Sequence, residues 1–170
     1  MTAALAALAG TPALANPPSV SVTADNDLAF GRMIVFSQGS RTVSYTGTVQ
    51  DSGVMNLPGS TARPAQFTVT FDRGNQSRRP LDVMIELVVF PASQVIVGGV
   101  TARLGQFDSD LPGASVLTAG QVYQIEFANC VTRTCSRTFH VGGRLDVTRA
   151  FGGAAIAIPI PVNATLVAMN

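Results

Sequence analysis

The clearest pattern in the chain is an alternation of apolar and other residues over residues 156–169. A period of two is typical of a β-strand with one face on a core and the other in water. Pro159 and Pro161 have the same parity, so they remove two backbone donors from the same side of the strand. We therefore predict one long C-terminal strand at a sheet edge, with its apolar face made of Ile156, Ile158, Ile160, Val162, Ala164, Leu166 and Ala168.

A second alternation lies near the start of the chain. Val20, Val22, Ala24, Leu28 and Phe30 share one parity, and only Asn26 interrupts the series. Such a segment suits two structures equally: the first strand of the domain itself, or an extension that adds a strand to a neighbouring copy. Residues 16–30 are therefore a candidate donor strand, and an intramolecular strand is the open alternative.

Shorter alternations fill the middle of the chain, at residues 67–71, 83–89 and 122–127, and Gly98-Gly99 has the form of a hairpin turn. Residues 51–65 and 105–115 are rich in turn-forming residues and are predicted to be loops. The pattern predicts roughly eight to ten short antiparallel strands in one domain. The expected fold is all-β, a single immunoglobulin-like or pilin-like β-sandwich with Greek-key-type connections. A closed barrel is the competing architecture.

Residues 1–15 differ from the rest, because they are rich in Ala and Leu and end in Ala-Leu-Ala. This composition indicates the apolar region and cleavage site of a signal peptide, followed by a mature domain over residues 16–170. The basic region that normally opens a signal peptide is missing, which leaves a start upstream of Met1 open.

Cys130 and Cys135 are the two cysteines, and four residues separate them. In an exported protein this spacing favours a disulfide across a tight turn, with two free thiols as the alternative.

Charge argues against two classes of partner. The chain has 11 basic and 10 acidic residues and a net charge of +1, so nothing favours binding to nucleic acid or to an anionic membrane. No apolar run reaches the roughly 18 residues of a membrane helix.

The candidate catalytic residues do not form a known set. His140 is the one histidine and lacks a Gly-x-Ser-x-Gly context, so we interpret it as a strand histidine. Glu86 and Glu126 lie opposite the apolar faces of their predicted strands, where carboxylates face solvent. We expect neither catalysis nor a cofactor.

Two acidic pairs could contribute to a calcium site. Asp25 and Asp27, and Asp108 and Asp110, each offer carboxylate oxygens two residues apart. Neither pair fits the EF-hand pattern, and Asx residues also favour turns. We expect no metal, and calcium at either pair stays open.

Three short motifs carry a family resemblance: Leu-Ala-Phe-Gly at residues 28–31, Phe-Thr-Val-Thr at 67–70, and Val-Gly-Gly-Arg-Leu-Asp-Val at 141–147. With the closing alternating strand, they resemble the DUF4402 family. The resemblance implies a small exported bacterial protein with a pilin-like domain, similar in layout to spore-coat-U-type and chaperone–usher pilins. The chain departs from those pilins at Met169, where they usually carry an aromatic residue, and in having a local rather than a long-range cysteine pair.

The resemblance implies a structural subunit of an extracellular filament, polymerising by β-strand complementation. Its partners would be copies of itself, with a periplasmic chaperone and an outer-membrane usher as candidates. Its place would be the cell surface, reached through the periplasm. The alternative is a secreted monomeric module that binds protein or sugar through residues 51–65 and 105–115. The absence of Trp disfavours sugar as the ligand of that module.

Overall fold

The structure is a computed structural model, and it describes residues 16–59, 61–75, 79–90, 94–149 and 154–170. The predicted signal peptide at residues 1–15 lies outside this part of the chain. The described residues contain strands and turns and no α-helix. The strands are β1 (Ser19–Asn26), β2 (Leu28–Val43), β3 (Val49–Asn56), β4 (Ala65–Asp72), β5 (Leu81–Val89), β6 (Val95–Val97), β7 (Val100–Leu111), β8 (Ala114–Leu117), β9 (Val122–Cys130), β10 (Thr134–Arg149), β11 (Ala154–Ile158) and β12 (Val162–Met169).

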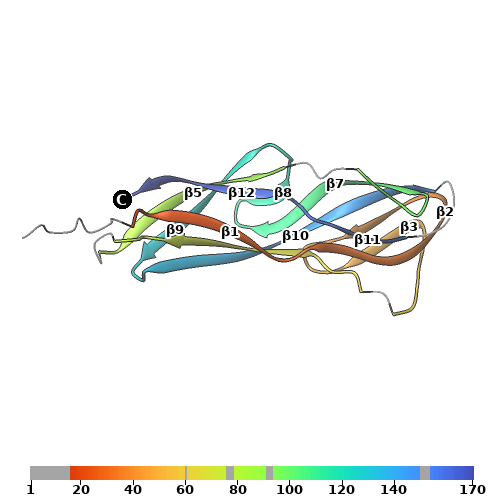
Figure 1. The fold of residues 1–170 in the computed structure, drawn as a ribbon, viewed down its shortest axis with the longest axis horizontal. Coiled ribbons are helices and arrows are strands. Elements are labelled where there is room, and N and C mark those ends of the chain that lie inside the picture. The colour runs from red at the N-terminus through yellow and green to blue at the C-terminus, as the bar shows by residue number, and fades with distance from the viewer. Residues whose placement is uncertain (1–15, 60, 76–78, 91–93, 150–153) are drawn as a thin grey trace, which may run out of the picture.

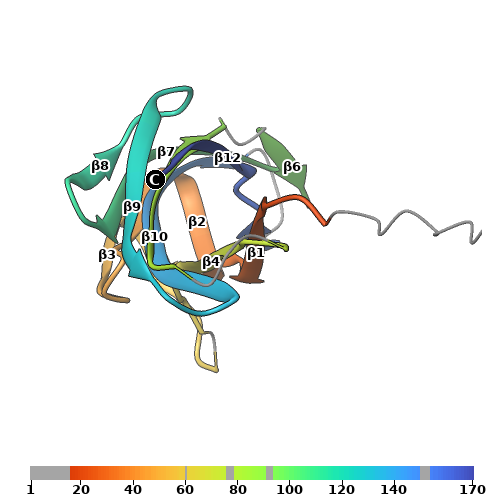
Figure 2. The same cartoon turned by 90° about the vertical axis from the view of Figure 1, so that its left-hand side faces the viewer.

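These strands form two antiparallel sheets. The larger sheet runs in the order β1-β4-β10-β2-β11, with β3 added to β2, β7 added to β10, and β6 and β8 added to β7. The smaller sheet has the order β12-β5-β9. Seen almost end-on, the strands surround a common core (Figure 2). The predicted all-β sandwich is confirmed, and in the described residues no ladder joins the two sheets into a closed barrel.

The molecule is elongated, and β10, which is 16 residues long, runs along most of it (Figure 1). The first half of β10 pairs with β4, and its second half pairs with β2 and β7. The change of partner falls at Gly142, where a Cβ atom would collide with the Asp108 carboxylate and with the backbone at Val43 and Tyr45. Only glycine leaves room for this crossing.

The core lies between the facing sides of the sheets. Along β4 and β5, residues alternate strictly between buried and half-buried or exposed, as their sequence pattern predicts. The rings of Phe67 and Phe139 stack with centroids 5.5 Å apart. Each fully buried Phe, Leu, Ile or Val side chain stabilises the fold by about 1.5–3 kcal/mol, so these two strands form the best-covered part of the sandwich.

The C-terminal segment forms two strands rather than the single predicted one. β11 pairs with β2 in the larger sheet, whereas β12 pairs with β5 in the smaller sheet. Residues 159–161, with their two prolines, carry the chain from one sheet to the other, and the Phe90 amide donates to the Pro161 carbonyl over 2.9 Å. Each strand lies at the end of its sheet. The apolar face is buried at Ile156, Ile158 and Ile160, and only half-buried at Val162, Ala164 and Leu166.

Parts of the two predicted loops are also strands. Residues 51–56 belong to β3, and residues 105–111 belong to β7. Both were missed because their residues are polar: most of β3 is exposed, and β7 carries a bulge where Gln106 has a φ of 52°. The hairpin predicted at Gly98-Gly99 is present between β6 and β7, and both glycines have positive φ.

A partly buried ion pair between Arg41 of β2 and Asp51 of β3 fastens β3 to the sandwich. Arg41 is 1% exposed, and its Nε and Nη2 atoms donate to Asp51 over 2.6 and 2.7 Å. Its Nη1 atom donates to the Phe30 carbonyl over 2.8 Å. Because β3 buries almost no apolar surface, this pair replaces the hydrophobic anchor that an edge strand normally has.

We expect Asp51→Ala to lower the free energy of unfolding by about 2–3 kcal/mol, because it leaves the buried Arg41 guanidinium without its counter-charge. Urea denaturation followed by circular dichroism would measure the loss. The control is Asp146→Ala, which breaks an exposed pair with Arg144 and should change stability by less than about 0.5 kcal/mol. Equal effects of the two substitutions would contradict the role given to Arg41.

Candidate assembly edge

The two sheets leave a pair of strand edges facing each other on one flank of the sandwich. Among the described residues, β1 pairs only with β4, and β12 pairs only with β5. β1 and β12 approach each other (Figure 2), yet no ladder joins them in the described residues. We call these two strands and the apolar residues between them the assembly edge.

The core is incompletely covered at the assembly edge. Val20 and Val22 on β1, and Val162, Ala164 and Leu166 on β12, contact the core but are only half-buried. In contrast, the inward-facing residues of the neighbouring strands β4 and β5 are fully buried. The two strands that flank the opening therefore retain apolar surface that another strand could cover.

The edge of β12 lacks the usual features that prevent association. Its sequence, Val-Asn-Ala-Thr-Leu-Val-Ala-Met, contains no charged residue and no proline. Natural sandwiches commonly protect exposed edges with such residues, because an unpaired strand edge can recruit a strand from another chain. β12 therefore lacks the residues that discourage an edge from pairing with another strand.

The residues of the candidate donor strand separate into two groups. Val20, Val22 and Ala24 lie on β1, whereas Leu28 and Phe30 lie on β2 and are fully buried in the core. A bulge between Ala24 and Asn26 ends the regular pairing of β1 with β4. In this structure β1 is thus the first strand of its own domain, the alternative that the sequence left open.

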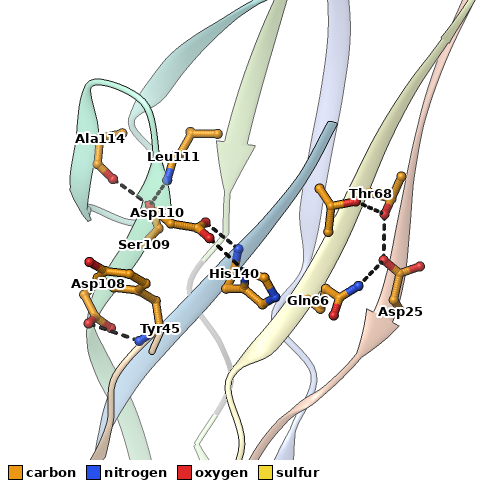
Figure 3. A network of polar contacts seen from close by, with 11 residues as sticks. Asp25, Tyr45, Gln66, Thr68, Asp108, Ser109, Asp110, Leu111, Ala114 and His140 are labelled. Carbon is orange, nitrogen blue, oxygen red and sulfur yellow. Dashed lines mark hydrogen bonds and ion pairs between the residues drawn. The ribbon is translucent and has the colours of Figure 1, made fainter. Parts of the chain in front are cut away.

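A small polar cluster holds the end of β1 (Figure 3). Thr68 Oγ1 on β4 donates to Asp25 Oδ2 over 2.7 Å, and the Gln66 amide donates to the same oxygen over 3.4 Å. Thr68 Oγ1 also lies 2.9 Å from Thr138 Oγ1 on β10. Asp25 therefore serves as an acceptor that fixes β1 on β4.

The second acidic pair also bonds to protein groups (Figure 3). Asp110 accepts from the backbone amide and Nδ1 of His140 over 2.6 and 2.8 Å. Asp108 Oδ2 accepts from the Tyr45 amide over 3.2 Å. Within the described residues, no three His, Cys, Asp or Glu side chains group as ligands for a metal ion.

Glu86 and Glu126 lie on the outer face of the small sheet. Glu86 is opposite Gln124, and Glu126 is opposite Met84, so the two carboxylates are diagonal neighbours on adjacent strands. The alternation in the sequence predicted that both carboxylates lie on the face opposite the core, and they do.

Cys130 and Cys135 form the predicted disulfide, with Cα atoms 6.1 Å apart. The bond closes the turn between β9 of the small sheet and β10 of the large sheet. Nearby, the Arg73 side chain donates to the Cys130 carbonyl over 2.6 Å. The disulfide therefore holds together the two ends of the turn that connects β9 in the small sheet to β10 in the large sheet.

These features define the class of protein: an elongated antiparallel β-sandwich whose first and last strands leave an open edge. Residues 20–163 match the sequence model of the family described as Domain of unknown function (DUF4402). The chain belongs to this family. No curated protein and no solved structure matches it. No helix in the described residues has the length and hydropathy needed to cross a membrane.

We expect replacement of both cysteines by alanine to lower the free energy of unfolding by about 2 kcal/mol, because the disulfide closes a loop of only six residues. The fold should persist, since the rest of the core is unaffected. Urea midpoints of the oxidised protein and the variant would measure the difference. Loss of the β-sheet circular dichroism signal at 25 °C in the variant would contradict this expectation.

Proposed function

We propose that this chain is a structural subunit of an extracellular bacterial filament, in which the β1 strand of one copy completes the sandwich of the next. The observation that carries the proposal is the assembly edge, with its incompletely covered core and an edge on β12 that carries neither charge nor proline. Strand addition uses backbone hydrogen bonds for affinity and alternate side chains for register.

β1 is suited to being donated. None of its eight residues is fully buried, so its removal exposes little apolar surface. Within the described residues, the chain connects β1 to the rest of the sandwich through Asp27, the single residue between β1 and β2. A change of backbone angles near Asp27 would direct β1 towards a neighbour without disturbing Leu28 and Phe30 in the core.

Exchange of β1 repeats the same contact from one copy to the next. The donating segment and the receiving edge are different surfaces, so the contact is heterologous and produces an open chain of subunits. Closed monomer and filament contain nearly the same β1–β4 ladder, as in domain swapping, and the free energies of the two forms are therefore close. Opening the monomer is the costly step, which favours a periplasmic chaperone and an outer-membrane usher as partners.

Export is part of the proposal. The apolar segment at residues 1–15 supports passage to the periplasm, and the disulfide agrees with an oxidising compartment. Mass spectrometry of the mature N-terminus would show whether the chain is cleaved before Asn16.

The first test of strand exchange is a crosslink. Ser21 on β1 and Ser136 on β10 are both direct neighbours of Thr70 on β4, on its two sides. Filaments of a Ser21→Cys, Thr70→Cys variant, assembled under mild reduction and then oxidised, should yield covalent ladders on denaturing gels, because each bond joins two copies.

The matched control is Ser136→Cys with Thr70→Cys, which should yield only crosslinked monomers because β4 and β10 stay within one copy. If the first variant in filaments also yields only crosslinked monomers, β1 is not exchanged. Monodisperse particles in electron microscopy of the unmodified exported protein would contradict the filament itself.

The second test removes the donor. We expect a chain lacking residues 16–26 to stay unpolymerised and to bind a synthetic peptide of residues 16–27. Deletion should stop there, because Leu28 and Phe30 belong to the core. A peptide with both Val20→Asp and Val22→Asp should bind at least about 30-fold more weakly, since each half-buried valine contributes about 1 kcal/mol. Polymerisation of the shortened chain, or equal binding of both peptides in titration calorimetry, would contradict this role of β1.

A further inference from the structure

A shallow polar cleft of about 340 Å³ lies on the outer face of the large sheet, where β2, β3 and β10 meet. It is lined by residues 38–40 of β2, 52–53 of β3, and 144 and 146–148 of β10. β1 lies beside β4, which pairs with the opposite end of β10. Thr138 of β10, near Asp25, and Asp146 in the cleft are separated by about 25 Å of extended strand. The cleft is therefore separate from the assembly edge.

The cleft is hollow because of an irregularity in strand pairing. Val35 pairs with Val54 and Ser40 pairs with Ser52, so four residues of β2 lie opposite the single residue Gly53. The Val35 carbonyl at the start of this bulge accepts from Arg149 Nη1 over 3.0 Å.

Two glycines keep the hollow open. A Cβ atom at Gly39 or at Gly53 would collide with the backbone of the facing strand, and Gly53 has a φ of +67°. The two strands thus pack backbone against backbone at the floor of the cleft, and no side chain fills the space above it.

The rim carries polar groups that the protein leaves unused. Arg144 Nε donates to Asp146 Oδ1 over 3.0 Å. The Nη groups of Arg144 and Oδ2 of Asp146 have no hydrogen-bond partner among the described residues. The remaining rim side chains likewise make no hydrogen bond within that part of the chain; they are Gln38, Ser40, Ser52 and Thr148.

These groups match the chemistry of a sugar ring. Hydroxyl and amide side chains both donate and accept, as sugar hydroxyls do, and the Arg144–Asp146 pair adds a donor fork and an acceptor with no net charge. Phe36 is one of the four bulge residues, two positions before Gln38, and its side chain is 64% exposed. A ring of this kind can cover the apolar face of a saccharide.

From the open cleft, its unused donors and acceptors and the exposed Phe36, we propose that this surface binds a neutral saccharide. The proposal does not depend on filament formation, because the cleft is formed within one copy. If the filament does form, each subunit would carry the same weak site, and repeated sites along one fibre would add avidity.

The test uses the full mature chain on an array of immobilised oligosaccharides that includes neutral, uronate-bearing and sulfated members. We expect at least one neutral oligosaccharide to bind, with a dissociation constant of roughly 1 mM for a single site. Asp146→Ala and Phe36→Ala should each weaken binding at least about tenfold. The matched control, Asp82→Ala, removes an exposed carboxylate of the small sheet and should leave binding unchanged.

Heteronuclear NMR with the best array member should show shifts confined to residues 36–40, 52–53 and 144–148. The proposal is overturned if no neutral saccharide binds, if only sulfated or uronate-bearing members bind, or if binding survives both Asp146→Ala and Phe36→Ala. Urea denaturation of each variant would show whether it is still folded, so that a loss of binding can be distinguished from unfolding.

Discussion

The backbone pairing of β10 is the interaction on which the rest of the structure depends. The first half of this strand pairs with β4 and its second half pairs with both β2 and β7, and the other strands of the large sheet attach through those three. A strand can change partners only where its neighbours may cross closely, and Gly142 provides that point because nothing larger fits between Asp108 and the backbone of residues 43–45. The length of the molecule follows, since its two halves lie one after the other along β10 (Figure 1).

The same constraint explains where the sandwich is open. The small sheet has three strands and covers only part of the large sheet, and residues 159–161 carry the chain between them. The first strand and the last strand therefore lie near each other at the ends of different sheets. Val20, Val22 and Leu166 remain half-buried there, because each has core atoms on one side and no paired strand on the other.

Much of the fold could be predicted because alternation reports directly on burial. Residues 67–71 and 83–89 are strands whose apolar residues face the core, and the disulfide between Cys130 and Cys135 followed from spacing and context. Residues 51–56 and 105–111 were predicted to be loops because edge strands and bulged strands bury few side chains and so lack the apolar period. The cleft residues had no distinguishing signal, since Ser40, Ser52 and Asp146 meet only through the pairing of three strands.

By itself the sequence determined the all-β class, the strongest core strands, the cysteine turn and the family, because each depends on local pattern or spacing. Only the tertiary structure decided that residues 156–169 divide between two sheets. It also decided that Leu28 and Phe30 belong to the core while Val20 and Val22 lie at an edge. The cleft at Gly39 and Gly53 likewise depends on how the strands pair. The physical reason is that a period of two fixes which face of a strand is apolar, whereas the choice of neighbouring strand depends on hydrogen bonds between residues far apart in the chain.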